Sequence, residues 1–489
     1  MSHFSLLDWA IVFLYLGGVT AFGLFKGGKQ QSAKDYFLSE EKINWITVAL
    51  SIVAAETSTI TFISVPGIAY TSNFNFLQLA FGYLIGRVFV ALYFLPRYYE
   101  GELTTAYVFI EKRFGLGIRR LMSSVFIITR IFAEGVRLYT PAIPLVVILK
   151  GYNLFTGVSD SMLYVVAILF TSALTILYVQ FGGVRAVIWT DFIQLFVYLF
   201  GGLAALLILL GKVPDANASL SMLAAQGKLD VFNFSFDNFF STPYQFFLAL
   251  FGGAFLSMAS HGTDYLIVQR LFTTDNLKDS QKAIVLSGAI VIVQFTIFLC
   301  VGSLLYVFYN GVQMRGDEVF SKFIIEGLPN GVSGLIVAGI FATAMSTLST
   351  AITSISSSTV FDLYANTEHG KTASEPEKFR FAKRASFLWS IVLTLAALGF
   401  IGLEKRVVDV ALSIASFTYG GLLGVFFLAV FFKGATARST AAGFLVSVVV
   451  MAYIITQTTL AWTLYVILGS SLTLLTSLLV SRFEPAEAG

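Results

Sequence analysis

The sequence predicts an all-α integral membrane protein, and three observations support this fold class. Of the 489 residues, 57% are hydrophobic and only 12% are charged, which is about half the charged share of an ordinary soluble domain. So few charges could not cover the surface of a water-soluble protein of this size. Apolar stretches of about 20 residues, the length that crosses a bilayer as a helix, recur along the chain. They are too long and continuous for the strands of a membrane β-barrel, which have about ten residues and alternate in polarity.

We expect about thirteen spanning helices. The first has neither the basic start nor the small-residue cleavage pattern of a signal peptide, so we expect it to be retained as a span. The predicted spans are 7–25, 46–70, 74–95, 120–149, 161–181, 187–210, 242–269, 281–309, 333–360, 382–403, 407–430, 440–456 and 460–480.

The distribution of basic residues predicts the orientation. With the N-terminus placed outside, the segments on the cytoplasmic side hold about three times as many lysines and arginines as the outer segments. The richest groups, at 26–42, 97–120 and 371–384, all fall on the cytoplasmic side. The sequence therefore predicts an N-terminus outside and a C-terminus inside.

Composition and motifs exclude several classes of function. The 31 basic residues nearly balance the 28 acidic ones, which gives no support for a nucleic-acid partner. A single cysteine, Cys300, excludes a disulfide framework and a cysteine-ligated metal cluster. No phosphate-binding G-x-x-x-x-G-K-[ST] run is present, so an ATP-driven pump is not expected. No nucleophile–base pair is visible either, and we expect no enzyme.

The predicted helix at 46–70 carries an acid where the bilayer is driest. Glu56 lies about ten residues into this span, or about 15 Å deep, and Thr57, Ser58 and Thr61 follow it closely. A helix that unwinds here would free backbone carbonyls for a cation and present half-helix ends to a solute. Alternatively, the hydroxyls bond to the preceding turn and Glu56 pairs with an arginine.

The predicted helix at 333–360 carries a stripe of hydroxyls. They recur at steps of three and four, so they share one face. Such oxygens suit a small hard cation, although a packing seam of small residues is the alternative. The stripe consists of Thr343, Ser346, Thr347, Thr350, Thr353, Ser354 and Ser357.

Further charges lie inside predicted spans, where each is costly. Asp191 is either interfacial or an ion ligand, and position alone does not separate the two. Arg130, Glu134 and Arg137 are spaced for a network within one helix. Arg87 is expected to be a packing partner.

Four stretches resemble the sodium/solute symporter family, which includes sodium-coupled glucose, iodide, multivitamin, proline and sialic-acid transporters. They are AKDYF at 33–37, GGVRAVIWTDFIQ at 182–194, GTDYLIVQR at 262–270 and the hydroxyl stripe. The resemblance covers nearly the whole chain and implies the LeuT-type fold with a 5+5 inverted repeat. All of 1–489 would form one transporter domain. Its parts would be an additional helix at 7–25, repeats at 46–210 and 242–430, and two additional helices at 440–480.

The resemblance also implies the ligands of sodium, the only cofactor expected. The first ion would be bound by the carbonyls of Ala54, Thr57 and Thr343 and the hydroxyls of Ser346 and Thr347. Some family members are described with a second sodium nearer the cytoplasm. The matching positions here are Asp191, Ser346, Ser349 and Thr350.

The solute site would lie beside the first ion, and here the sequence departs from the sialic-acid branch. Glu56 stands where that branch has a hydroxyl, and Glu134 lies close to the position of its carboxylate-binding arginine. Two carboxylates suit sugar hydroxyls or an amine, unless Arg137 neutralises one. The candidate solute residues are Glu56, Ser58, Thr61, Glu134, Arg137, His261 and Asp264.

The sequence thus predicts a sodium-coupled secondary active symporter that imports a small polar organic solute by alternating access. The solute would be a sugar or sugar-like molecule, a carboxylate or an amino acid. The expected partners are sodium, the solute and the lipid bilayer of the plasma membrane, or of the inner membrane in a prokaryote. The alternatives are a membrane solute sensor and a proton-coupled transporter of the same fold.

Overall fold

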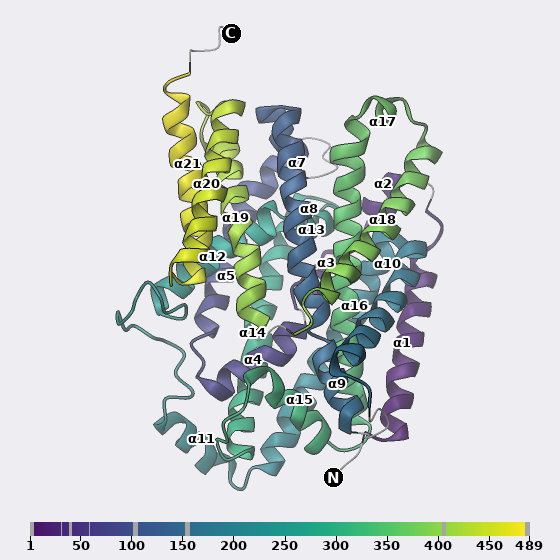
Figure 1. Ribbon diagram of the computed structural model, residues 1–489, viewed down its shortest axis with the longest axis vertical. Coiled ribbons are helices and arrows are strands. Elements are labelled where there is room, and N and C mark those ends of the chain that lie inside the picture. Colours follow the sequence, from purple (N-terminus) through teal and green to yellow (C-terminus); the bar gives the residue numbers. More distant parts are fainter. Residues whose placement is uncertain are drawn as a thin grey trace.

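A computed structural model describes residues 4–30, 32–38, 42–57, 59–100, 106–151, 157–402 and 407–484 of the chain. Every regular element in these ranges is a helix (Figure 1), which confirms the all-α prediction. The α-helices are α1 Leu6–Gly27, α2 Ala33–Leu38, α3 Trp45–Glu56, α4 Thr59–Thr71, α5 Leu77–Phe89, α6 Leu95–Tyr99, α7 Ala106–Phe114, α8 Leu116–Tyr139, α9 Ala142–Gly151, α10 Asp160–Lys212, α11 Ala216–Ala225, α12 Phe246–Met258, α13 Tyr265–Leu271, α14 Leu277–Phe308, α15 Gly316–Glu326, α16 Val332–Ser358, α17 Glu368–Thr372, α18 Glu375–Leu398, α19 Val407–Phe431, α20 Ala437–Gln457 and α21 Tyr465–Ser481.

Ten helices in the described ranges are long and apolar enough to cross a membrane, or eleven when a bent pair counts as one span. The sequence predicted about thirteen, and two helices explain the difference. α10 has 53 residues, about 80 Å of helix, and its backbone turns at Gly183 (φ 58°, ψ −162°). It therefore contains two of the predicted spans. α8 is not among the ten helices, because it carries five charged side chains: Arg119, Arg120, Arg130, Glu134 and Arg137.

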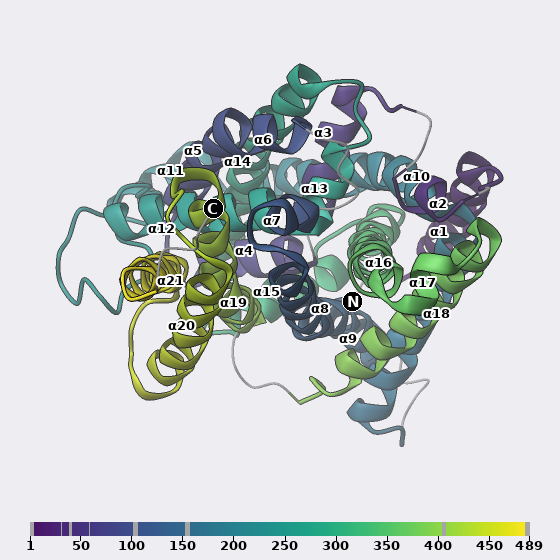
Figure 2. The same cartoon turned by 90° about the horizontal axis from the view of Figure 1, so that it is seen from above.

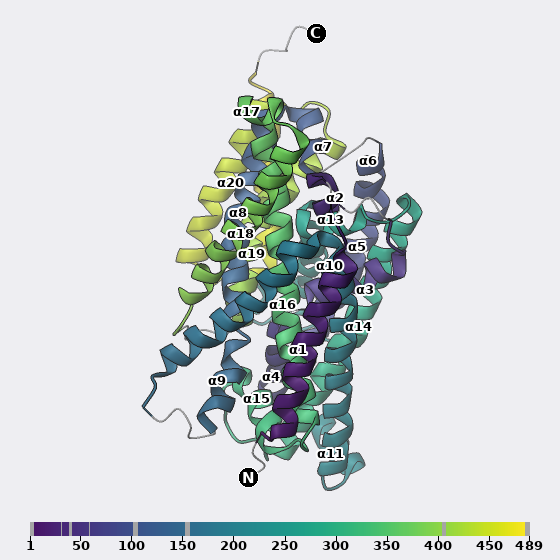
Figure 3. The same ribbon diagram turned by 90° about the vertical axis from the view of Figure 1, so that its right-hand side faces the viewer.

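The ends of the helices support this interpretation of α10. α9 and α11, which flank α10 in the chain, both lie at the lower end of the molecule in Figure 1, and Figure 3 shows the same arrangement from the side. α10 must therefore run up through the bundle and return. The start of α1 and the end of α21 lie at opposite ends (Figure 1). That the lower end faces outside stays a prediction from the basic residues.

Two spans are broken rather than continuous. α3 ends at Glu56 and α4 begins at Thr59, with an angle of 64° between them, which confirms the predicted break. The expectation of a continuous helix over 242–269 is wrong. There α12 passes into a short π-helix, Ala259–Thr263. Asp264 is then extended (φ −81°, ψ 120°), and α13 begins at the next residue. Asp264 then caps α13, because its Oδ1 accepts a hydrogen bond of 2.9 Å from the Leu266 amide.

α16 forms the centre of the bundle. Nearly every residue from Val332 to Ser358 is buried, and α1, α8, α10 and α18 surround it (Figure 2). A helix that is buried on all sides has no water or lipid to meet its polar groups. Its hydroxyls must therefore bond to carbonyls of α16 itself, as those of Ser349, Thr353 and Ser354 do, or to the surrounding helices or a ligand.

Candidate functional site

The break between α3 and α4 is held by side chains of three other helices. The Thr57 hydroxyl lies 2.8 Å from Nε2 and 3.0 Å from Oε1 of Gln294 on α14. Tyr198 of α10 donates a hydrogen bond of 3.2 Å to the same Gln294 oxygen. The hydroxyls of Thr59 and Thr343 lie 2.7 Å apart and join α4 to α16. Side chains thus support the backbone where the helix is interrupted.

The residues predicted to hold the first sodium lie at this break and on the facing stretch of α16. All five are buried: Ala54, Thr57, Thr343, Ser346 and Thr347. The Thr347 hydroxyl is buried without a hydrogen-bond partner among the described residues. An unpaired buried hydroxyl costs about 1–3 kcal/mol, and a bound cation would satisfy it. The oxygen set therefore fits a small hard cation.

The residues predicted for a second sodium are also brought together. Ser346 donates a hydrogen bond of 2.6 Å to Asp191 Oδ1, and the Ser349 hydroxyl donates to the Ser346 carbonyl at 2.9 Å. Thr350 lies close by, where Arg270 donates a hydrogen bond to its hydroxyl. All four candidate residues are buried.

Arg270 is the residue that sequence reasoning missed at this cluster. Its Nη2 forms a 2.6 Å ion pair with Asp191 Oδ2, and its Nε donates a hydrogen bond of 2.9 Å to Ser51. Ser51 in turn donates to Asp191 at 3.2 Å. Asp191 is thus buried within the protein, and its charge is balanced by a guanidinium from α13.

A cavity of about 110 Å³ lies between the two broken helices. Four of the predicted solute residues line it: Glu56, Thr61, Arg137 and His261. Ser58 falls outside the described residues. Glu134 and Asp264 are not among the lining residues. Each forms an ion pair with Arg130, which does line the cavity. Much of the remaining wall is apolar and includes Phe76, Leu256, Ile267 and Phe295.

Glu56 faces the cavity but is also paired. Its carboxylate forms an ion pair with the fully buried Arg87 of α5. Arg87 also donates a hydrogen bond of 2.7 Å to Ser287 of α14. His261 lies on the other side, with its Nε2 3.6 Å from Glu56 Oε2. Glu56 therefore pairs with an arginine, as one interpretation of the sequence predicts, and it also lines the cavity.

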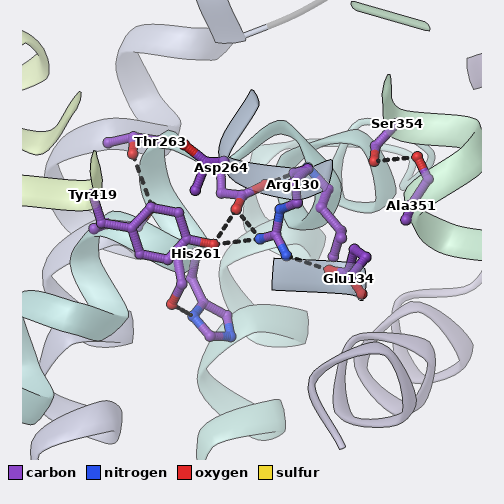
Figure 4. A network of polar contacts seen from close by, with 12 residues as sticks. Arg130, Glu134, His261, Thr263, Asp264, Ala351, Ser354 and Tyr419 are labelled. Carbon is purple, nitrogen blue, oxygen red and sulfur yellow. Dashed lines mark hydrogen bonds and ion pairs between the residues drawn. The ribbon is translucent and has the colours of Figure 1, made fainter. Parts of the chain in front are cut away.

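Arg130 joins three parts of the bundle (Figure 4). Its Nη1 donates a hydrogen bond of 2.6 Å to Glu134, one turn along α8, as the spacing predicted. Its Nη2 forms an ion pair with Asp264 at the second break. Tyr419 of α19 hydrogen-bonds to both Arg130 and Asp264. The network within α8 therefore extends to the broken helix and to α19, which sequence spacing could not show.

The charges around the cavity balance, but Arg137 is the least engaged of them. Its only ion pair among the described residues is with Glu134, at 3.5 Å, and its side chain is 21% exposed. Among the described residues, the ion pairs around the cavity contain three guanidiniums and three carboxylates, those of Arg87, Arg130, Arg137, Glu56, Glu134 and Asp264. A solute that carries one negative group would therefore find a partner in Arg137.

Comparisons with known proteins agree on family and fold. A sequence profile described as "Sodium:solute symporter family" matches residues 36–450. The chain is 27% identical to the sodium/sialic acid symporter SiaT of Proteus mirabilis, over 100% of this chain and 97% of that protein. It is also 27% identical to the sodium/iodide cotransporter of Homo sapiens, over 90% of this chain and 68% of that protein. Equal identity to carriers of two different solutes leaves the solute open.

Solved structures give the fold. The outward-open, substrate-bound structure of a Na+-coupled sialic acid symporter matches with a TM-score of 0.87 and 25% identity, covering 99% of each chain. Mhp1, a nucleobase-cation-symport-1 transporter, matches with a TM-score of 0.55 and 12% identity, over 93% of this chain and 95% of that one. The architecture is therefore LeuT-like, as the family resemblance implies. The repeat boundaries stay a prediction.

Proposed function

The chain belongs to the sodium:solute symporter family, and from this premise we propose that it imports a small organic carboxylate together with sodium. Membership makes it a multi-pass, sodium-coupled transporter and not an enzyme. The observation that carries the choice of solute is Arg137, a cavity-lining guanidinium whose only ion pair among the described residues is a 3.5 Å contact with Glu134.

The size and wall of the cavity support a small carboxylate. An apolar cavity of about 150 Å³ holds a benzene molecule, so the present cavity of about 110 Å³ suits a solute of a few carbon atoms. Phe76 and Phe295 offer an apolar surface to the rest of that solute. The relatives named for sialic acid and for iodide both carry anions, which agrees with a cationic contact in the site.

We assign the sodium sites to the residues that the family resemblance implies. The first ion lies between the α3–α4 break and α16, held by oxygens of Ala54, Thr57, Thr343, Ser346 and Thr347. The unpaired hydroxyl of Thr347 supports this assignment. A second ion at Asp191, Ser346, Ser349 and Thr350 requires the Asp191–Arg270 pair to share its carboxylate.

Coupling follows from the position of the break. Sodium bound there stabilises the end of α3 and the start of α4, and Glu56 and Thr61 on these elements line the solute cavity. Sodium therefore favours the state that binds solute, and this differential affinity is what coupling requires. One charge that moves across 100 mV contributes about 2.3 kcal/mol. Alternating access in the plasma membrane, or the prokaryotic inner membrane, then accumulates the solute.

The test is uptake into proteoliposomes with an imposed sodium gradient. Acetate, lactate and pyruvate should be accumulated, while uncharged sugars of similar size should not. Arg137→Gln should abolish carboxylate uptake but retain sodium binding, measured as sodium-dependent thermal stabilisation. Arg315→Gln is the matched control, because Arg315 is 61% exposed outside the cavity. Accumulation of a neutral sugar that is insensitive to Arg137→Gln would overturn the carboxylate assignment.

Proton coupling is the second candidate, and one contact favours it. His261 and Glu56 lie 3.6 Å apart in the cavity wall, and such a pair can exchange protons. An inward proton gradient without sodium should drive no uptake if sodium is the coupling ion. Uptake under that condition would replace sodium by protons as the driving ion.

A further inference from the structure

The connection between α11 and α12 exposes a row of phenylalanines. It runs along the outside of the bundle, from α11 to the neighbouring ends of α20 and α21 (Figure 1 and Figure 2). Adjoining exposed apolar side chains mark a surface that meets another molecule or a membrane. We propose that this phenylalanine row inserts into the lipid bilayer at the membrane surface where α12 begins. More than half of each side chain of the row is exposed: Phe232 53%, Phe234 59%, Phe236 66% and Phe240 66%.

The backbone of this connection is fixed by hydrogen bonds to three other parts of the chain. The Asn233 amide donates a hydrogen bond of 3.1 Å to Gln78 Oε1 at the start of α5. The Asn233 carbonyl accepts one of 2.7 Å from the Phe246 amide at the start of α12. Farther along, the Phe240 carbonyl accepts a hydrogen bond of 2.7 Å from the Ala461 amide, which lies between α20 and α21. The fold therefore holds the row at the surface.

The rings of the row pack together beside α12, while polar groups between them bond to one another. The rings of Phe232 and Phe234 stack with their centroids 6.0 Å apart. Both lie against the ring of Phe246, at 5.9 Å and 4.7 Å. The Ser235 amide donates a hydrogen bond of 3.0 Å to the side chain of Asn233. The connection is therefore amphipathic, because its rings form one apolar surface and its polar groups satisfy each other.

The level of the row along the bundle matches a membrane surface. α12 belongs to a candidate membrane span that begins at Phe246, and the ring of Phe236 lies 6.0 Å from that of Phe247 in the first turn. α20 and α21 are also candidate spans, and they meet beside Phe240, which is bonded to Ala461 between them. The ends of spanning helices lie near the surfaces of the bilayer. Three such ends therefore place the row at one of these surfaces.

The outer face of α12 continues the row into the membrane. Phe247 and Phe251 are 41% and 56% exposed and lie one turn apart, so they share a face of α12. That face of a spanning helix meets acyl chains, and Phe247 joins it to the row through its contact with Phe236. No lysine or arginine lies within 229–247, so burial of apolar surface, and not attraction to anionic lipid, drives the insertion. The partner is therefore the apolar part of the bilayer, whatever the headgroup.

The test measures the depth of a spin label attached to the row. Cys300→Ser gives a chain without cysteine, and Phe236→Cys in this background carries the nitroxide in phosphatidylcholine vesicles. Oxygen concentrates inside a bilayer, whereas a nickel chelate stays in water. The ratio of oxygen to chelate collisions, measured by power-saturation EPR, should be several-fold higher at position 236 than at an exposed polar position. Phe240→Cys should give the same result and keeps the test valid if the first variant fails to fold.

Ser235→Cys is the matched control, because Ser235 is an exposed polar residue of the same segment. A label there should collide mainly with the nickel chelate. Equal chelate accessibility at positions 235 and 236 would refute insertion. Protection of position 236 from both reagents would mean that a second copy or another protein covers the row, and it would also overturn the proposal. The measurement needs no transport, so its outcome is independent of the proposed solute and coupling ion.

Discussion

Asp191 of α10 and Arg270 of α13 form an ion pair of 2.6 Å in which neither side chain is exposed. The pair joins the returning arm of α10 to the short helix that follows the second break. Both charges have been removed from water, so each is stable only with the other. The pair also balances the charge of the second candidate sodium site before any cation binds there.

Asp191→Asn should therefore destabilise the protein as well as weaken sodium coupling. Loss of one partner from a buried ion pair costs about 3–5 kcal/mol, because the remaining charge is uncompensated. Thermal unfolding should show a large drop in Tm for this variant. The double variant Asp191→Asn/Arg270→Gln should recover most of that stability, and a single variant as stable as wild type would contradict the pairing.

Ser346→Ala should weaken sodium activation of uptake by tenfold or more. The Ser346 hydroxyl donates to Asp191 and belongs to both proposed sodium sites. The solute KM at saturating sodium should change far less, because Ser346 is not among the residues that line the cavity. Ser356→Ala is the control, since this α16 hydroxyl is equally buried and has no partner among the described residues. Equal sodium activation in both variants would exclude Ser346 as a ligand.

The break at Glu56 could be predicted because an acid and hydroxyls inside an apolar span violate the rule for spanning helices. The same kind of signal was present at the second break, where Ser260, His261, Thr263 and Asp264 interrupt an apolar run. The span predicted at 242–269 nevertheless treats this run as one continuous helix. In the structure, polar residues within an apolar span mark an interruption of the helix in both places.

Partners distant in sequence could not be predicted. Gln294 meets Thr57 across 237 positions, and Arg270 meets Asp191 across 79. Helical periodicity fixes the face of a helix on which a residue lies but not the helix that packs against it. The stripe on α16 could thus be found from sequence, whereas the groups that complete each site required the tertiary structure.

Arg130→Met should be strongly destabilising. Arg130 pairs with Glu134 and Asp264, and its loss leaves two buried carboxylates without their main partner. We expect a fall of about 3–5 kcal/mol in the free energy of unfolding, measured by denaturant titration in detergent. Arg97→Met is the control, because its pair with Glu100 is about half exposed and should contribute at most about 1 kcal/mol. Similar losses in both variants would mean that the Arg130 network does not hold the broken helix.

Gly302→Ala should damage α4, the second half of the broken helix. A Cβ at Gly302 of α14 would overlap the backbone of Pro66 in α4, and backbone cannot move aside as a flexible side chain can. The substitution should cost about 1–3 kcal/mol by overpacking. It should also raise the solute KM, because α4 carries Thr61 into the cavity.

Gly18→Ala is the matched test of that steric argument. Gly18 lies in α1, and apart from its own helix backbone no atom of the described residues lies within 4 Å of its would-be Cβ. Alanine is favoured over glycine in a helix by up to about 1 kcal/mol. This variant should be as stable as the wild type or more so, with unchanged solute KM. If both alanine variants behave alike in thermal unfolding and uptake, the effect arises from helix propensity, and close contact between α14 and α4 does not position the solute site.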